Sequence, residues 1–299
     1  MQNKKIMSFA DAINDALKIS MTKNKKILLL GLGVNDPKNI FGTTKDLNKK
    51  KFQNQIYDMP TAENSMMGIG IGLSIRGFRP IISHQRVEFS LLAMEQIINQ
   101  AAKWSYMFAG TMKVPLVIRL IIGKGWGQGP QHSQSLESIF AHIPGLKVVC
   151  PSNAYEAKGL LLSSIEDNNP VIFFEHRWLH HTKSIVPKKN YKIPLGKAKI
   201  FTKGKSLTIV SSSLMTNEIL SLKELLKENQ IFPEIIDLRS LRPLDKKPII
   251  KSVKKTKRLL VLDNGWTSYG ISAEIISSVM ESLQTKLLAP PIRLGLNDS

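Results

Sequence analysis

The feature that most constrains the fold is a repeated alternation of short apolar segments with longer segments of helical periodicity. The apolar segments have the length and composition of buried strands, and they lie at residues 26–31, 78–83, 114–122, 146–150 and 171–175. Between them, apolar residues recur at helical spacing, for example at residues 8–21, 88–106 and 154–165. Strands that are joined through helices run parallel, because the helix returns the chain to the same end of the sheet. The sequence therefore predicts an α/β fold built on a parallel sheet.

The alternation runs in two series. The second begins with an expected strand at residues 207–210, followed by an expected helix at 215–227. Between the two series, residues 183–205 carry many lysines, two prolines and no acidic residue. A chain of 299 residues also suits two domains, at roughly 150 residues each. We therefore predict a domain over residues 1–182, a basic linker or edge segment over 183–205, and a smaller α/β domain over 206–299.

The charge of the chain bears on its partners. Lysine and arginine together number 42 against 23 acidic residues, which gives a formal net charge of +19. Such a charge suits nucleic acid, an anionic substrate or an acidic partner. No sequence pattern of a nucleic-acid-binding module accompanies it, so we expect no nucleic-acid partner and interpret the lysines of the linker as a solvated surface.

Two further observations bear on location. The apolar runs of the chain are shorter than the ~18 residues that a membrane span requires, so no membrane partner is expected. The single cysteine, Cys150, excludes an intramolecular disulfide and suits a reducing compartment. We therefore expect a cytoplasmic protein.

Several familiar motifs are incomplete in this chain. Gly31 and Gly33 follow a strand, but Asp36 stands where a dinucleotide-binding fingerprint needs its third glycine. The glycine-rich loop at residues 123–129 lacks the Gly-Lys-Ser/Thr ending of a phosphate loop. The histidines show no zinc-binding spacing, and no Gly-x-Ser-x-Gly segment is present. The sequence thus argues against these nucleotide-binding and nucleophile motifs.

Two residues remain as candidates for chemistry. Glu63 is expected in the first turn of a helix that follows a strand and Pro60. Its alternative role is structural, because an acid at this position stabilises the helix dipole by about 1 kcal/mol or less. His132 lies in a loop between a strand and a helix, where catalytic residues of parallel sheets gather. Its alternative role is an ordinary hydrogen bond within the loop.

A set of long motifs, in order along nearly the whole chain, identifies a family resemblance. The motifs are Gln131–Ser135, Phe140–Val149, Pro151–Ser152, Ala157–Leu160, Asp167–Val171 and Ile236–Asp245. With them the chain resembles the beta subunit of the thiamine-diphosphate-dependent decarboxylating component of 2-oxo acid dehydrogenase complexes, of the pyruvate dehydrogenase type. These subunits are transketolase-like. The resemblance implies an N-terminal domain that binds the pyrimidine of the cofactor and a C-terminal domain of the transketolase type.

The resemblance also implies a partner chain. In the family, an alpha subunit holds the diphosphate and its Mg²⁺ through a Gly-Asp-Gly…Asn motif, and this chain has no Gly-Asp-Gly segment. We therefore expect an alpha subunit in an α2β2 assembly with the active sites at the α/β interfaces. The family's reaction further implies a lipoyl acyltransferase as acceptor of the acyl group.

Site residues follow from the same resemblance. Glu63 matches the glutamate that hydrogen-bonds N1′ of the aminopyrimidine and so promotes loss of the C2 proton. Phe89 matches the aromatic residue that stacks on the pyrimidine, and its alternative role is that of a core aromatic. Gln85 falls at a position close to the cofactor, and His132 matches the histidine that assists substrate or lipoyl handling. A structural K⁺ site of some members matches Leu116, Ser164, Asp167 and Asn169.

The chain departs from the family pattern near this site. Leu32 and Gly33 stand where the family usually carries one or two acids. Arg86 and Glu88 fall near the expected pocket, and Trp126 lies in the loop before His132. This altered charge suggests a 2-oxo acid other than pyruvate, or a polyhydroxylated substrate.

The sequence leaves two enzyme functions open. The first is a beta subunit of a 2-oxo acid dehydrogenase that decarboxylates its substrate and passes the acyl group to a lipoyl carrier. The alternative is half of a split transketolase-like or acyloin-forming enzyme that acts on a sugar-related substrate without a lipoyl partner.

Overall fold

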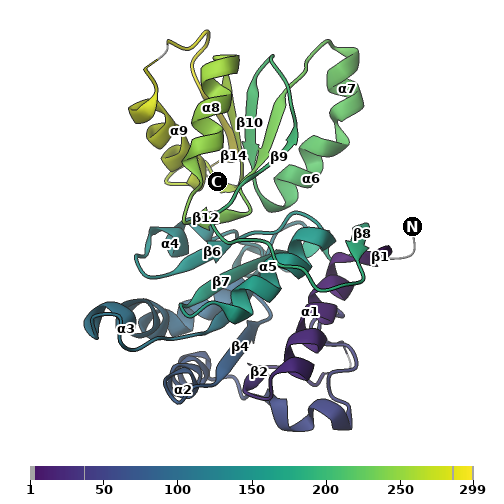
Figure 1. Cartoon of the computed structure of the whole chain (residues 1–299), viewed down its shortest axis with the longest axis vertical. Coiled ribbons are helices and arrows are strands. Elements are labelled where there is room, and N and C mark those ends of the chain that lie inside the picture. The colour runs from purple at the N-terminus through teal and green to yellow at the C-terminus, as the bar shows by residue number, and fades with distance from the viewer. Residues whose placement is uncertain (1–3, 37, 285, 298–299) are drawn as a thin grey trace.

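The structure of the chain, a computed structural model, describes residues 4–36, 38–284 and 286–297. The described residues form a seven-stranded sheet, a five-stranded sheet and a two-stranded ribbon (Figure 1). The seven-stranded sheet has the order β12-β6-β7-β5-β4-β2-β3. Its strands are β2 (Ile27–Gly31), β3 (Ile56–Asp58), β4 (Arg79–His84), β5 (Val117–Ile122), β6 (Lys147–Val149), β7 (Val171–His176) and β12 (Ser240–Arg242).

The seven-stranded sheet is parallel except for β12, which pairs antiparallel with β6. Side chains of β2 alternate between its two faces: Leu28 and Leu30 join one buried cluster, and Ile27 and Leu29 join another. The helices of this half are α1 (Phe9–Lys23), α2 (Glu63–Ile75), α3 (Ala102–Met107), α4 (Glu137–His142) and α5 (Ala154–Glu166). Helices α1 and α5 pack against each other on one face, and α2 covers the other. The predicted α/β fold is confirmed.

The five-stranded sheet forms the other half of the molecule, at the top of Figure 1, with the order β14-β13-β10-β11-β9. Its strands are β9 (Lys199–Thr202), β10 (Thr208–Ser211), β11 (Glu234–Asp237), β13 (Leu259–Trp266) and β14 (Ile292–Leu296). Its helices are α6 (Ser213–Ser221), α7 (Lys223–Glu228), α8 (Lys246–Thr256) and α9 (Ile271–Ser282). Among the described residues, no helix is long and apolar enough to cross a bilayer.

The junction between the halves contains more structure than a linker. Residues 183–205 supply β8 (Lys183–Pro187), which pairs with β1 (Lys4–Ser8), and then β9, at the edge of the five-stranded sheet. Later in the chain, β12 returns to the seven-stranded sheet. The three-part division of the chain stays a prediction, and one strand crosses it.

Two predicted helices are broken. Residues 88–106 do not form one α-helix: a 3₁₀ segment (Val87–Ala93), a π-helical turn (Gln96–Ala101) and α3 follow one another. π-Helical turns are frequent at functional sites, and this one follows the segment that carries Phe89. The helix expected at 215–227 divides at Leu222 into α6 and α7. Both interruptions depend on tertiary contacts, which helical periodicity does not reveal.

Candidate active site

The carboxyl ends of the parallel strands define one edge of the seven-stranded sheet. Strands β2, β4 and β7 end there at Gly31, His84 and His176. Ligand sites of parallel α/β sheets form at this edge, because the loops that follow the strands meet there. The predicted residues Glu63, Gln85 and His132 all follow such strand ends.

Glu63 lies at this edge in a small pocket. It is the first residue of α2, its side chain is buried, and the pocket is lined by Leu32, Pro60, Glu63, Met66, Ser83, His84, Gln85 and Phe89. No hydrogen bond found among the described residues uses the Glu63 carboxylate. Burial lowers the pKa of His84 to about 4, so this imidazole is neutral, and its Nε2 has no partner. The pocket thus combines a free carboxylate, an aromatic ring and apolar walls.

His132 lies beside this pocket rather than in its wall. The rings of Phe89 and His132 meet edge to face with their centroids 5.4 Å apart. The His132 carbonyl accepts a hydrogen bond from Trp126 Nε1 at 2.9 Å. Two residues further on, the Gln134 amide donates to Glu88 Oε1 at 2.7 Å. These contacts fix the His132 loop against the segment that carries Phe89, so the structure brings together all four residues predicted for catalysis and cofactor binding.

Of the two residues that replace the expected acids, Leu32 lines the pocket, and Gly33 lies beside the lining residue Gln85. The Leu32 carbonyl accepts from Gln85 Nε2 at 3.0 Å, and the Gly33 amide donates to Asp58 Oδ1 at 2.7 Å. Gly33 has φ of +73°, and a Cβ there would lie 2.6 Å from Gln85 Nε2. Backbone conformation and space therefore both favour glycine, and Asp58 supplies the nearby carboxylate.

The loop after β2 carries an unusual backbone. Asn39, Ile40 and Phe41 have φ of +53°, +42° and +56°, so three consecutive non-glycine residues adopt left-handed conformation. This conformation costs roughly 1–2 kcal/mol per residue, and such strain gathers at functional sites. The turn places the Phe41 ring against the guanidinium groups of Arg86 and Arg177, at 5.4 Å and 4.5 Å.

A buried ion pair holds this turn in place. Arg119, on β5, donates to both carboxylate oxygens of Glu175, from Nε at 2.6 Å and from Nη2 at 3.0 Å. Its Nη1 donates to Ser83 Oγ at 3.0 Å, and Nη2 also donates to Thr43 Oγ1 at 2.9 Å. Although burial raises the pKa of Glu175, the Arg119 charge holds it below its ordinary value. Arg119 therefore joins three strands to the loop that presents Phe41.

Of the residues predicted for K⁺, Ser164, Asp167 and Asn169 are joined by hydrogen bonds, and Leu116 bonds to Val171 just after them. The Leu116 carbonyl accepts from the Val171 amide at 2.8 Å, and the Asp167 amide donates to the Ser164 carbonyl at 3.2 Å. The Asn169 amide and side chain both donate to Asp167 Oδ1, and Lys147 forms an ion pair with the same carboxylate. Arg79 donates to the Asp167 carbonyl at 2.9 Å. Within the described residues, no group of three or more metal-ligating acids, histidines or cysteines is found.

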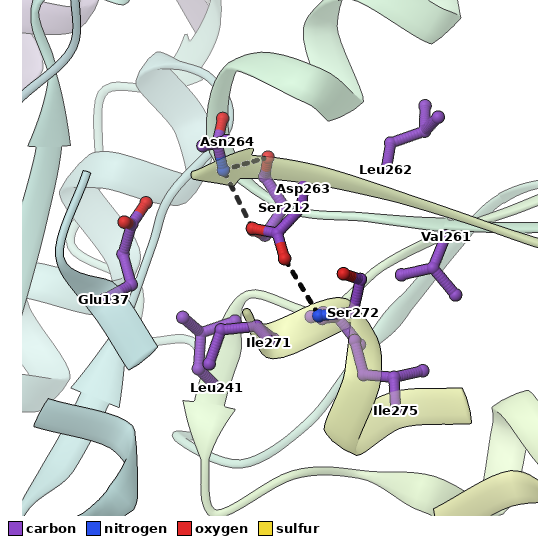
Figure 2. Close-up of a pocket in the computed structure, with 11 residues that line it drawn as sticks. Glu137, Ser212, Leu241, Val261, Leu262, Asp263, Asn264, Ile271, Ser272 and Ile275 are labelled. Atoms are coloured by element: carbon purple, nitrogen blue, oxygen red, sulfur yellow. Dashed lines mark hydrogen bonds between the residues drawn. The ribbon is translucent and has the colours of Figure 1, made fainter. Parts of the chain in front are cut away.

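A second small pocket lies between the two halves of the chain. Figure 2 shows Glu137, from α4, facing Asp263 and Asn264, from β13. Burial, with the charge of Asp263, raises the pKa of Glu137 to about 8. Atoms of three lining side chains, Glu137 Oε1, Asn264 Oδ1 and Ser272 Oγ, have no hydrogen-bond partner. Sequence reasoning missed Glu137, because nothing in its local pattern marks it as buried.

Comparison with known proteins follows from this architecture. Residues 5–181 match the family model described as "Transketolase, pyrimidine binding domain", and residues 196–299 match "Transketolase, C-terminal domain". A solved structure described as "Split gene transketolase, inactive beta4 tetramer" has the same fold, with a TM-score of 0.80 at 22% identity. The matched region covers 98% of this chain and 90% of the solved chain. Fold and pocket thus define a transketolase-type α/β protein.

Curated relatives place the chain within that class. It is 42% identical over 288 residues to the pyruvate dehydrogenase E1 component subunit beta of Porphyra purpurea. The aligned region covers 96% of this chain and 87% of the relative. It is 39% identical to the acetoin:2,6-dichlorophenolindophenol oxidoreductase subunit beta of Cupriavidus necator, over 92% of this chain and 84% of the relative. The chain belongs to the family of beta subunits of thiamine-diphosphate-dependent 2-oxo acid dehydrogenases.

Proposed function

We propose that the chain is the beta subunit of a thiamine-diphosphate-dependent enzyme that decarboxylates a 2-oxo acid. The observation that carries this proposal is the Glu63 pocket, which lies at the carboxyl edge of a sheet that matches the pyrimidine-binding domain. A buried carboxylate without a hydrogen-bond donor, beside an aromatic ring, suits a planar, protonatable heterocycle. When bound, thiamine diphosphate supplies a carbon nucleophile and an electron sink for decarboxylation.

Each protein residue then has a defined task. The Glu63 carboxyl group would pass a proton to a ring nitrogen of the pyrimidine and take it back, which is general acid–base work at a fixed atom. Phe89 and Gln85, which line the same pocket, would hold the heterocycle there, the Phe89 ring by stacking. His132, held by Trp126 and by the ring of Phe89, stands at the rim where it can donate a hydrogen bond to the substrate.

The proposal requires a second chain. The relatives are named as beta subunits, so an alpha subunit that carries the diphosphate and Mg²⁺ site is proposed, in an α2β2 assembly, with a lipoyl acyltransferase as the acceptor. Free, buried Cys150 supports a reducing, cytoplasmic location. We propose no nucleic-acid partner for the basic surface.

The experiment that tests the proposal uses the two chains co-expressed. Binding of thiamine diphosphate with Mg²⁺ and release of CO₂ from a panel of 2-oxo acids are measured for wild type and Glu63→Gln. We expect release to require both chains and to fall by roughly 100-fold or more in Glu63→Gln, as general acid–base catalysis predicts. Glu228→Gln, a substitution of an exposed glutamate on α7, serves as the control and keeps wild-type activity. Absence of cofactor binding by the paired chains would overturn the proposal.

A second substrate class is supported by the comparisons. The relatives named for acetoin are nearly as similar to this chain as those named for pyruvate. An acyloin substrate, cleaved or formed at the same site, is therefore the second candidate. Turnover of acetoin without CO₂ release from any 2-oxo acid would favour it, and lipoyl-dependent turnover of a 2-oxo acid would favour the first.

A structural K⁺ remains a proposal as well. The carbonyls of Leu116, Ser164 and Asp167 each have a second lone pair, which a monovalent cation can use. If K⁺ binds there, replacing K⁺ by choline lowers the melting temperature, and Na⁺ restores it less well than K⁺. Equal melting temperatures in all three salts would contradict the site.

A further inference from the structure

Arg86 is a buried cation without an anionic partner. Arg86 belongs to the segment that runs from Gln85 to Phe89, and it is only 7% exposed. Its Nη2 donates to the neutral Gln128 Oε1, and its Nη1 has no hydrogen-bond acceptor. Within the part of the chain that the structure describes, no ion pair involves it. Burying a guanidinium with an unsatisfied donor costs free energy, unless a ligand accepts a hydrogen bond from that donor.

A second guanidinium shares this environment. Arg86 and Arg177 both lie against the ring of Phe41, and burial lowers the pKa of each below its ordinary value. The charge of Arg177 acts in the same direction on Arg86, and the nearby charge of Glu88 opposes it. One Glu88 oxygen accepts from the Gln134 amide, and the other is buried without a hydrogen-bond partner and forms no ion pair with Arg86 in the described residues. The two cations thus lie against the same strained turn, and among the described residues neither forms an ion pair with a carboxylate.

The pair borders the candidate active site directly. The Arg86 guanidinium lies 4.8 Å from the ring of Trp126, whose Nε1 donates to the His132 carbonyl. Arg86 also directly follows Gln85, which lines the Glu63 pocket. An anion bound at Arg86 Nη1 would therefore lie near the loop that carries Trp126 and His132, beside the segment that lines the Glu63 pocket.

We propose that Arg86 and Arg177 bind an oxyanion group of the substrate that is remote from the reacting carbonyl: a distal carboxylate or a phosphate. The proposal rests on the proposed function and narrows its substrate class. The carboxylate next to the reacting carbonyl suits these arginines poorly, because it leaves as neutral CO₂. Ion pairs to a group that loses its charge stabilise the ground state more than the transition state. A distal anion keeps its charge throughout, so the two arginines hold it without opposing the reaction.

Matched substrates test this assignment in the co-expressed enzyme. 2-Oxoglutarate is compared with 2-oxopentanoate, which has the same chain length without the distal charge. Xylulose 5-phosphate is compared with xylulose, each supplied with the same aldehyde as acceptor of its two-carbon ketol fragment. For wild type we expect kcat/KM to favour one charged member over its neutral counterpart by roughly 10- to 100-fold, as charge-assisted hydrogen bonds permit. The carboxylate pair and the phosphate pair distinguish the two sources of the anion.

Variants assign the preference to these residues. Arg86→Gln and Arg177→Gln should each lower the charged-to-neutral ratio by about 10-fold or more, mainly through KM, while cofactor binding persists. Arg258→Gln, an exposed arginine near Ser206 on the other half of the chain, makes the same charge change and should leave the ratio intact.

A readout without turnover completes the design. Because Arg86 lies on the Trp126 ring, titration of the αβ enzyme with 2-oxoglutarate or inorganic phosphate should change tryptophan fluorescence, and Trp126→Phe should remove that change. Loss of cofactor binding in wild type would refute the proposed function itself. Normal cofactor binding and turnover, with the charged-to-neutral ratio unchanged by Arg86→Gln and no fluorescence response, would overturn the anion assignment alone.

Discussion

Two buried arginines near the same sheet edge differ in how their donors are used. Arg119, 1% exposed, donates to Glu175, Ser83 and Thr43. Arg86 lies against aromatic rings, donates to one neutral amide and keeps an unused Nη1. Burial removes the hydration of both guanidinium groups, but only Arg119 has an ion pair and hydrogen bonds within the chain that offset the loss. The difference teaches that one arginine supports the fold, whereas the other is held ready for a group that the chain does not supply.

Arg119→Met tests the supporting role and should have the largest effect. Removing the guanidinium leaves the Glu175 carboxylate buried without its cation, which costs about 3–5 kcal/mol of unfolding free energy. Urea unfolding measures it. The double variant Arg119→Met with Glu175→Leu should recover part of the loss, because no buried charge is then uncompensated. If the unfolding free energy of the single variant fell by less than about 1 kcal/mol, Arg119 would not have the supporting role and would resemble Arg86.

Glu137→Gln extends the comparison to an unpaired carboxyl group. The Glu137 pKa of about 8 lies above its unfolded value, so the folded state retains a proton that the unfolded state releases. Wild-type stability should therefore fall by up to about 1.4 kcal/mol per pH unit as the pH rises from about 5 to 8. The variant should lack this part of the decline, as measured by melting temperature against pH. Glu228→Gln should keep the wild-type slope, and an identical slope in Glu137→Gln would contradict the assignment.

Thr43→Val tests the link between the two arginines. The substitution removes the oxygen that accepts from Arg119 Nη2 and the hydroxyl that donates to the Ile40 carbonyl. We expect a loss of about 1–3 kcal/mol in urea unfolding. Because the same turn carries Phe41, the charged-substrate preference should weaken as well. Thr111→Val, at an exposed hydroxyl that donates to Phe108, is the matched control.

Arg86→Met should have the smallest effect on stability. Removing an unpaired buried charge relieves its desolvation, so the unfolding free energy should change by less than about 1 kcal/mol, or rise. The same variant should lose the preference for charged substrates. A destabilisation of several kcal/mol would show that Arg86 is structural, like Arg119.

The sequence predicts the fold well because strand–helix alternation is a local signal. The buried strands and most helices lie where periodicity places them, and Glu63 follows its strand as expected. Tertiary features escape this reasoning. Phe41 stands in a polar loop, and Arg177 follows a strand without any motif, so nothing in the local pattern shows that Phe41 lies against both Arg86 and Arg177. The buried position of Glu137 likewise depends on the other half of the chain.

The return of β12 to the seven-stranded sheet has a consequence for how the chain is made. Strand β6 gains its outer neighbour only when Ser240–Arg242 are available, long after the rest of that sheet has been synthesised. Until then, a nascent chain on the ribosome carries an open β6 edge, and open edges are sites of wrong pairing between chains. A chain that stopped before residue 240 would therefore leave the β6 edge of the larger sheet unpaired and prone to pairing with other chains.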